Sequence, residues 1–266
     1  MIGIVAAGGI PSPDHSLYAY TQGMPKAMIE INGRPMVESV VDALLDSQRI
    51  KEVIVVGLPQ DLGGLLNTLS APILLPDEGS LVANAAAGLR WVRENRPEVS
   101  TVIGCSSDIP HLSGKMVDHL IAACRPYDRI LYYTFVSKDQ IEERYPGAKR
   151  TYVYFSDREM VAPGDIFLSQ VKILDTDMAL WDKLTGARKY PLQVARIIGF
   201  QTLIKFALRR LTLDEAATIG GRLLGSDLPV GIYDSPYAEM AMDGDKPAQI
   251  ELLRATPLPA SSSSSG

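Results

Sequence analysis

The sequence predicts a three-layer α/β fold in which helices cover both faces of a mostly parallel sheet. Short runs of consecutive apolar residues alternate along the chain with segments whose apolar residues recur at helical spacing. Strands that are buried on both faces have such continuous apolar runs, whereas the helical spacing indicates amphipathic helices. Alternation of the two patterns is typical of a parallel sheet with crossover helices, which gathers its ligands at the carboxyl ends of the strands.

The individual elements follow from this pattern in chain order. Strands are expected over residues 1–7, 52–57, 71–76, 100–108 and 128–137, and helices over residues 35–48, 62–69, 80–95 and 113–124. Between residues 149 and 174 the apolar residues alternate with polar ones and with turn formers, which indicates antiparallel strands or a hairpin added to the sheet. Helices return between residues 177 and 224, and residues 237–255 suggest an edge strand, a turn and a closing helix.

No repeat or clear linker divides the chain. We therefore expect one domain over residues 1–258, with an accessory insertion around residues 138–235 and a disordered serine-rich tail at residues 259–266. The helix expected within residues 195–211 has an apolar face and a basic face. Packing on the domain or on a second subunit is preferred to membrane-surface binding for this helix, because Gly199 and Gln201 interrupt its apolar face.

Composition excludes several classes of protein. The chain has 266 residues, 46% of them hydrophobic, which is enough for a substantial core. A net charge of -5 argues against a non-specific nucleic-acid surface, and no run approaches the roughly 20 apolar residues of a membrane span. Cys105 and Cys124 lack metal-like spacing, so they are expected to be buried free thiols in a cytoplasmic protein without a targeting segment. The sequence does not decide whether the protein forms a homo-oligomer.

The loop after the first strand is the first candidate site. Ala6, Ala7, Gly8 and Gly9 are small enough to let the backbone approach a ligand, and glycine amides can point at phosphate oxygens. Lys26, at the end of the same long loop, would bring a positive charge to those phosphates. Residues 10–23 between them are expected either to form a mobile lid or to pack permanently on the domain through their tyrosines.

Two acidic positions form the second candidate site. Asp108 directly follows an apolar strand and precedes Pro110, which ends strand pairing and exposes the carboxylate at the sheet edge. Asp243 and Asp245 flank a glycine between another apolar run, expected to be a strand, and the closing helix. Because the carboxyl ends of parallel strands share one edge, Asp108 and Asp245 are the expected metal ligands, with Asp243 as the alternate. Each of them alone would more commonly be a helix cap or a turn residue.

Four segments in this order resemble the nucleotidyltransferases of the sugar-nucleotide pyrophosphorylase and molybdopterin-guanylyltransferase-like (MobA-like NTP transferase) superfamily. They are "VAAGG" with "MPKAMIEINGRPMVESVVDAL", then "GSLVANAAAGL", "CSSDIPHL" and "AMDGDKPAQIELLRA", and they span most of the chain. The resemblance implies a Rossmann-like fold of the GT-A type and a nucleotidyltransferase that uses Mg²⁺. It would transfer a nucleoside monophosphate from a triphosphate to a small acceptor, a phosphorylated one by preference, and release pyrophosphate.

Residue roles follow from the resemblance. Lys26 and Asp108 would be catalytic, Asp108 and Asp245 would bind Mg²⁺, and the glycine loop, Lys26 and the middle segment would bind the nucleotide. The nucleotide-binding residues implied are Ala6, Ala7, Gly8, Gly9, Lys26, Ser80, Asn84 and Gly88. The acceptor-binding candidates, Lys149, Arg150, Gly164 and Asp165, have as their alternative a solvated basic turn and a plain β-turn.

The sequence departs from the family pattern in its first loop. Members usually carry an Arg there that contacts the leaving phosphates, but no Arg lies between Gly9 and Lys26, and His15 would replace it only by folding inward. Two other functions therefore stay open at this point. A glycosyltransferase on the same kind of fold would use a finished sugar nucleotide, which needs Lys26 less than a triphosphate does. A catalytically silent nucleotide-binding protein would explain the missing Arg.

Overall fold

The computed structural model describes residues 1–64, 66–158, 160–180 and 199–258. The strands are β1 Ile2–Ala6, β2 Glu30–Ile31, β3 Arg34–Pro35, β4 Glu52–Val56, β5 Ile73–Leu75, β6 Thr101–Ser106, β7 Leu131–Ser137, β8 Val161–Gln170 and β9 Val230–Asp234. The α-helices are α1 Tyr18–Thr21, α2 Met36–Leu45, α3 Gln60–Gly63, α4 Leu81–Asn95, α5 Gly114–Ala123, α6 Lys138–Arg144, α9 Phe200–Ala207, α10 Leu213–Leu224 and α11 Pro247–Ala255. Three 3₁₀ helices are η1 Lys26–Met28, η2 Val171–Asp175 and η3 Ala238–Ala241.

One sheet of seven strands organises the described residues, in the order β5-β4-β1-β6-β8-β7-β9. Every neighbouring pair is parallel except the two pairs that involve β8, so β8 is the one strand of this sheet that runs against the others. A second sheet consists of the short antiparallel pair β2-β3. The predicted mostly parallel α/β fold with a small antiparallel element is confirmed.

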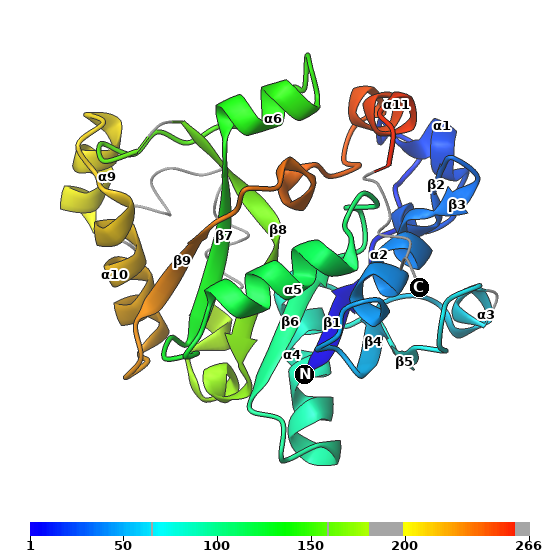
Figure 1. Cartoon of the computed structure of the whole chain (residues 1–266), viewed down its shortest axis with the longest axis horizontal. Helices are drawn as coiled ribbons and strands as arrows, with labels where there is room; N and C mark the ends of the chain where they lie inside the picture. The colour runs from blue at the N-terminus through cyan, green and yellow to red at the C-terminus, as the bar shows by residue number, and fades with distance from the viewer. Residues whose placement is uncertain (65, 159, 181–198, 259–266) are drawn as a thin grey trace, which may run out of the picture.

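Helices lie on both faces of the large sheet. Helices α2 and α5 lie in front of it in Figure 1, whereas α4 lies behind it. The front layer buries one large apolar cluster and the back layer a second, which includes Ile4 of β1 and Leu89 and Val92 of α4. Both faces of the central strands are therefore buried, which is why β1, β4 and β6 have continuous apolar sequences.

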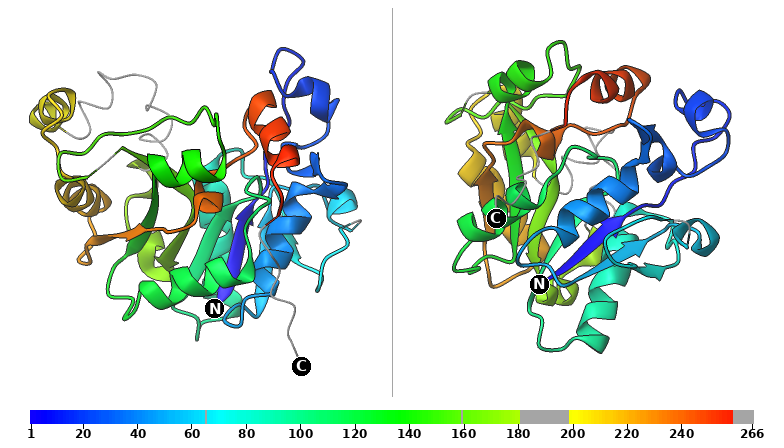
Figure 2. Two further views of the ribbon diagram at one scale, coloured as in Figure 1. Left: turned by 45° about the horizontal axis from the view of Figure 1, so that its top comes forward. Right: turned by 45° about the vertical axis from the view of Figure 1, so that its right-hand side comes forward.

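The topology brings distant segments to one edge. The carboxyl ends of β1, β4, β6 and β7 all point the same way, and the loops that leave them share that edge with α11 (Figure 1). Helix α11, drawn in red, lies beside α1 of the opening loop, drawn in blue (Figure 2), and the Tyr20 hydroxyl donates to Glu251 across that contact at 3.1 Å. The first and last parts of the chain therefore meet at the edge where a ligand is expected.

The structure corrects three expected elements. Helix α3 covers residues 60–63 instead of 62–69. Residues 149–174 contribute one long strand, β8, which is antiparallel to both neighbours as the first of the two expected alternatives has it; in place of the hairpin, the described residues show an isolated bridge between Val153 and Val161. The apolar run before Asp243 forms η3 instead of an edge strand: Met240, Ala241 and Met242 are fully buried, so this run is part of the core and not a sheet edge.

Helix α6 was not expected, and the segment around α9 differs from expectation. The Ser137 side chain and Gln140 form a reciprocal capping box at the start of α6. Helix α9 has no buried residue, and Phe200 and Leu208 are more than half exposed. Its apolar face is therefore only partly covered by the described part of the domain, and packing on a second subunit stays open. Residues 195–198 of this predicted helix, and the tail 259–266, lie outside the described residues.

Candidate functional site

The loop after β1 lines a cavity of about 550 Å³ at the carboxyl edge of the sheet. Ala6, Gly8 and Gly9 contribute to its wall. Ala7 does not: it is fully buried, and its amide donates to the carbonyl of Val56 at 2.8 Å, which extends the pairing of β1 with β4. Ala6, Gly8 and Gly9 therefore face the cavity, whereas Ala7 between them fixes the loop to the sheet.

Gly8 has no room for a side chain. A Cβ atom at this position would lie 2.7 Å from Asn84 Nδ2 and 2.8 Å from Asp77 Oδ1. Those two side chains bond each other at 2.9 Å, and the Glu78 amide donates to Asn84 Oδ1 at 2.7 Å. Asn84 therefore holds the loop before α4 against the glycine loop. No sequence pattern pointed to Asp77, whose role here is to fix Asn84.

Helix α4 begins at this cavity. Its N-cap is Ser80, whose hydroxyl accepts from the amide of Ala83 at 3.1 Å, and both Ser80 and Asn84 line the cavity. Gly88, one turn further along, does not line it. A Cβ at Gly88 would lie 2.6 Å from Ile4 Cγ2, so this glycine lets α4 pack closely on β1. Its position favours a packing role instead of direct contact with a ligand.

Lys26, Asp108 and Asp245 meet at the mouth of the cavity. The Lys26 ammonium donates to Asp108 Oδ2 and, at 2.5 Å, to Asp245 Oδ1. The Gly244 amide donates to the Asp108 carbonyl at 2.9 Å, which holds the turn that carries Asp245 against the end of β6. Residues separated by more than 200 positions in the sequence therefore form one charged cluster at this edge.

Electrostatics in the cluster favour its charged forms. Burial of Lys26 disfavours its charge, but Asp108 and Asp245 outweigh that effect and raise its pKa. For Asp108, burial acts to raise the pKa, and the ammonium of Lys26 more than compensates, so the pKa is lowered. The Asp108 side chain is only 4% exposed, so its carboxylate stays ionised because a cation lies beside it.

The cluster also fits a divalent cation. Asp108 Oδ1 is buried and has no hydrogen-bond partner among the described residues, so one carboxylate oxygen is available next to the Lys26 ammonium. No group of three or more His, Cys, Asp or Glu side chains in the described ranges is arranged to hold a metal. Mg²⁺ commonly binds to one or two carboxylates and takes its other ligands from phosphate and water, so Asp108 and Asp245 meet that requirement.

Asp243, the alternate metal ligand, is held by other partners. It forms an ion pair with Arg150 and accepts from Gln249 Nε2 at 2.7 Å. Burial raises its pKa, although the Arg150 guanidinium acts in the opposite direction. With both partners in place, the carboxylate of Asp243 fixes the turn to α11, which leaves Asp245 as the more accessible ligand.

The structure separates the four acceptor candidates. Gly164 and Asp165 line the cavity. Pairing of β7 with β8 shifts here, because only Thr134 lies between the pairs Tyr133–Phe167 and Phe135–Pro163. Such a bulge reorients side chains, and Asp165 is one of the residues it carries.

The basic pair behaves differently. Lys149 is exposed and does not line the cavity. The Arg150 side chain is 8% exposed and is engaged by Asp243 and, at 3.4 Å, by Asp165. Burial of Asp165 raises its pKa well above the ordinary value, and the neighbouring Asp243 adds to that effect. The structure therefore does not bring Lys149 and Arg150 together as a free phosphate-binding pair.

The opening loop is partly packed on the domain. Leu17 is fully buried in the front core, and Tyr20 contacts α11 through Glu251 and lies under the Arg254 guanidinium. His15 is exposed, and its Nδ1 accepts from the amide of Leu17 at 3.2 Å, so it does not fold inward to replace the missing Arg. For residues 17–21 these contacts favour the packed loop over a mobile lid.

Both cysteines are buried and free, as predicted. Burial raises the pKa of the Cys124 thiol to about 12, so it is held as an unreactive thiol. Cys105 lies at the end of β6 and contributes to the cavity wall, and burial likewise raises the pKa of its thiol.

Within the described ranges, no helix is both long and apolar enough to cross a lipid bilayer.

Together, the fold and the site define a nucleotide-binding α/β transferase. A small-residue loop, a helix N-terminus and two carboxylates, one after β6 and one in the turn before α11, surround one cavity at the carboxyl edge of the sheet, which is where such folds bind nucleotides. The family model of the MobA-like NTP transferase domain matches residues 3–196, so the chain belongs to this family and is a nucleotidyltransferase. The predicted family is confirmed. No curated protein sequence matches the chain.

Solved structures agree with this classification. A hypothetical transferase from Thermus thermophilus is 29% identical with a TM-score of 0.78, and the alignment covers 94% of this chain and 98% of that one. The 4-diphosphocytidyl-2C-methyl-D-erythritol synthase of Anaerococcus prevotii is 14% identical, with a TM-score of 0.57 and coverage of 96% and 94%. A CMP:2-keto-3-deoxy-manno-octonic acid synthetase complexed with CTP is 15% identical, with a TM-score of 0.57 and coverage of 96% of both chains. The last two show similarity of fold.

Proposed function

We propose that this protein transfers a nucleoside monophosphate from a nucleoside triphosphate to a small-molecule acceptor, with Mg²⁺ and with release of pyrophosphate. The observation that carries the proposal is the cluster of Lys26, Asp108 and Asp245 beside the glycine loop. It brings two carboxylates and a lysine to the same place, beside backbone amides that can receive phosphates.

The reaction would be an in-line displacement. An oxygen of the acceptor attacks the α-phosphorus, the bond from that phosphorus to its bridging oxygen breaks, and the electron pair leaves with pyrophosphate. The backbone at Gly8 and Gly9 and the start of α4 hold the nucleotide, and Lys26 contributes positive charge at the outer phosphates. Mg²⁺ bound by Asp108 and Asp245 would neutralise phosphate charge. Positioning and charge stabilisation supply most of the catalysis in such transfers.

Two further parts of the proposal, the position of the acceptor and the cellular location, go beyond what family membership implies. The acceptor binds on the side of Gly164 and Asp165, which line the cavity beyond the carboxylate cluster. A cytoplasmic location is supported by two buried free thiols, which fit a reducing compartment. The extent of the domain, residues 1–258 with an insertion around 138–235, remains a proposal, and so does a homo-oligomer.

A pyrophosphate-release assay tests the proposal directly. Each of the four nucleoside triphosphates is supplied with Mg²⁺ and a panel of phosphorylated and hydroxylated acceptors. Asp108→Asn should lose at least about a hundredfold in turnover while keeping its fold, because it removes one charge from the reacting centre. Asp175→Asn is the matched control, since Asp175 is an exposed carboxylate paired with Arg93 at 3.1 Å outside the cavity. Full activity in Asp108→Asn would contradict the assignment of this carboxylate.

Measurements of nucleotide binding distinguish the proposed enzyme from the remaining alternative, a catalytically silent binding protein. A catalytically silent binding protein would bind a triphosphate with Mg²⁺ and release no pyrophosphate with any acceptor. Lys26→Ala should weaken triphosphate binding much more than monophosphate binding, because the charge it removes lies near the outer phosphates. Equal weakening of both would place Lys26 away from those phosphates. The glycosyltransferase alternative is not supported, because the family model is that of NTP transferases.

A further inference from the structure

Helix α9 and the residue that follows it carry exposed apolar side chains at the periphery of the molecule (Figure 1). Phe200, Ile204 and Leu208 are 67%, 42% and 60% exposed. They are spaced four residues apart, so they lie on one face of the helix, and we call them the apolar stripe. Phe206 on the same helix is 43% exposed. The stripe is therefore a continuous apolar surface that the described part of the domain does not cover.

The structure removes the two interruptions that argued from the sequence against binding of this helix to a membrane surface. Gly199 is the N-cap of α9 with a φ of 92°, so it precedes the helix and does not interrupt its face. Gln201 directly follows Phe200 and therefore lies about 100° around the helix axis from it, outside the stripe. The apolar face of α9 is thus continuous over its whole length.

The segment that carries the stripe is also basic. Residues 199–213 contain Lys205, Arg209 and Arg210 and no Asp or Glu, in a chain whose net charge is -5. Lys205 pairs with Glu215 of α10 at 2.6 Å. Arg209 and Arg210 are exposed and form no ion pair with a described residue. Positive charge is therefore concentrated next to exposed apolar surface, against the overall charge of the chain.

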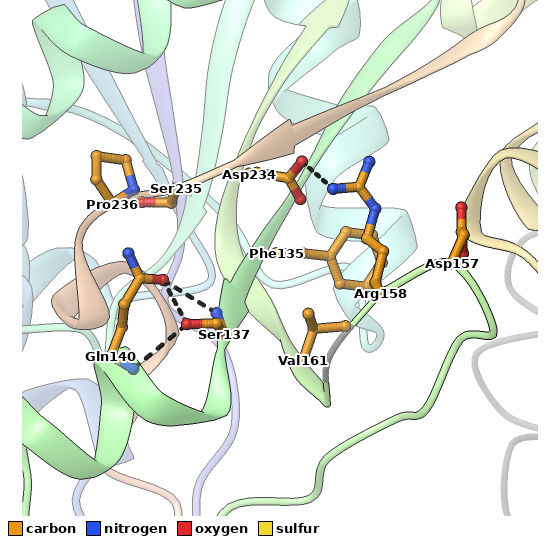
Figure 3. Close-up of a pocket in the computed structure, with 9 residues that line it drawn as sticks. All are labelled: Phe135, Ser137, Gln140, Asp157, Arg158, Val161, Asp234, Ser235 and Pro236. Carbon is orange, nitrogen blue, oxygen red and sulfur yellow. Dashed lines mark hydrogen bonds and ion pairs between the residues drawn. The ribbon is translucent and has the colours of Figure 1, made fainter.

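The residues after α9 anchor this segment to the domain. Leu211 and Leu213 belong to a small buried apolar cluster with Phe155 and Val161. The Asp157 carboxylate, labelled in Figure 3, accepts from the amide of Leu213 at 2.9 Å. A second cavity, of about 370 Å³, lies beside this anchor, and like the first cavity it is lined by no residue of α9. The anchor therefore fixes the start of α10, while the stripe remains exposed and apart from both cavities.

Charge distinguishes the two surfaces that could cover the stripe. A second copy related by two-fold symmetry would present the same patch, so it would bring like charges together. An anionic lipid surface attracts those charges, and a helix with an apolar face and basic residues beside it is typical of binding in the plane of a membrane surface. We propose that α9 docks the protein reversibly on an anionic membrane surface, with the apolar stripe among the lipid headgroups and Arg209 and Arg210 in contact with them. This inference does not depend on the proposed function.

Flotation with lipid vesicles tests the proposal. Vesicles of equal parts phosphatidylglycerol and phosphatidylcholine should bind the protein, and vesicles of phosphatidylcholine alone should bind it much less. Phe200→Ser combined with Leu208→Ser should lower the partition coefficient at least about tenfold, because less apolar surface enters the lipid. Arg209→Gln combined with Arg210→Gln should lower it about fivefold for each charge removed, and added salt should weaken wild-type binding in the same way.

The matched control is Leu69→Ser combined with Leu258→Ser. These two side chains are 68% and 58% exposed, close to the exposure of Phe200 and Leu208, but they lie outside α9. The control should bind vesicles as the wild type does. Depth of insertion is measured with Phe200→Trp, whose emission should shift to the blue on anionic vesicles, whereas that of Leu69→Trp should not.

The contrary outcomes are equally defined. Absence of binding to anionic vesicles, unchanged binding by the stripe variant and the arginine variant, or an equal loss in the control would overturn the proposal. Light scattering tests the second copy: a wild-type dimer that becomes a monomer in Phe200→Ser with Leu208→Ser would assign the stripe to a protein interface instead. Circular dichroism checks that each variant is folded, and if the stripe variant is not, the arginine variant and the Phe200→Trp emission decide the question.

Discussion

Replacing Lys26 by Met removes the one cation that pairs with both carboxylates of the cluster. Asp108 is 4% exposed, Lys26 is 22% exposed and Asp245 is 54% exposed, so the main loss concerns Asp108. Breaking a fully buried ion pair by removing one partner costs about 3–5 kcal/mol. Partial exposure of Lys26 places the expected loss in the free energy of unfolding below that range, at about 2–3 kcal/mol. A loss of this size lowers the melting temperature by about 5–10 °C.

Mg²⁺ should reverse much of this loss. If Asp108 and Asp245 bind the metal, the variant offers two carboxylates without a competing ammonium group, so millimolar Mg²⁺ should stabilise Lys26→Met more than the wild type. Urea unfolding followed by circular dichroism, with and without Mg²⁺, measures both effects. Na⁺ at matched ionic strength serves as the control for general screening.

Two further variants make the test specific. In Lys26→Met combined with Asp108→Asn no buried charge is left unpaired, so most of the lost stability should return. Lys149→Met removes an exposed lysine outside the cavity and should change stability by less than about 0.5 kcal/mol. If Lys26→Met matched Lys149→Met, or if Asp108→Asn failed to restore stability, the cluster would not be the electrostatic unit described above.

Three other perturbations have defined outcomes. Burial, and then the nearby Arg144, lower the pKa of His111 from 6.5 to about 4, so the stability it contributes while neutral is present above pH 6.5 and is lost as the pH falls toward 4. The loss is on the order of 3 kcal/mol, and His111→Gln should flatten this slope in urea unfolding at stepped pH. Gly88→Ala places a Cβ 2.6 Å from Ile4 Cγ2, so it should cost about 1–3 kcal/mol by overpacking and leave triphosphate affinity per folded molecule unchanged in calorimetry. Arg150→Met leaves two carboxylates without their guanidinium and should lower the urea midpoint clearly, and a midpoint equal to the wild type would contradict its structural role.

Sequence patterns predicted the elements that obey one clear period. Residues 80–95 begin with a Ser that caps the helix and continue at helical spacing, and α4 begins and ends within one residue of that prediction. The run before Asp108 is continuously apolar and forms β6. The run at residues 237–242 is also largely apolar, apart from Glu239, but forms η3, because its burial comes from packing on β7 and β8 and not from strand pairing. A short apolar run does not distinguish those two environments.

The candidate site was predictable where chain order fixes geometry. Asp108 follows the end of β6 and the small-residue loop follows β1, so their meeting at one edge follows from the sheet, whereas Asp245 reaches the same edge after η3 and not from a strand end. Asp77 did not follow, because its role depends on a contact with Asn84 that no local pattern records. The expectation of a free basic pair at Lys149 and Arg150 meets a similar limit: partners from β8 and from the turn before α11 neutralise the Arg150 guanidinium, while Lys149 stays exposed. A charged residue can be identified from the sequence, but the distant residues that pair with it in the fold cannot be identified from a local pattern.

Because the opening loop lacks the usual Arg, Lys26 has two roles: it pairs with the carboxylates of the cluster and, under the proposed function, it binds the outer phosphates of the nucleotide. Among the described residues that line the first cavity, Lys26 is the one positively charged side chain. Without ligand its charge is committed to Asp108 and Asp245. It becomes available to the outer phosphates of a nucleotide only when another cation takes over those carboxylates. Under the proposed function, Mg²⁺ and triphosphate should therefore each raise the affinity of the protein for the other by the same factor, as linkage requires. Calorimetric titration of either ligand in the presence of the other measures that factor, and in Lys26→Met it should shrink, because no ammonium remains to be released.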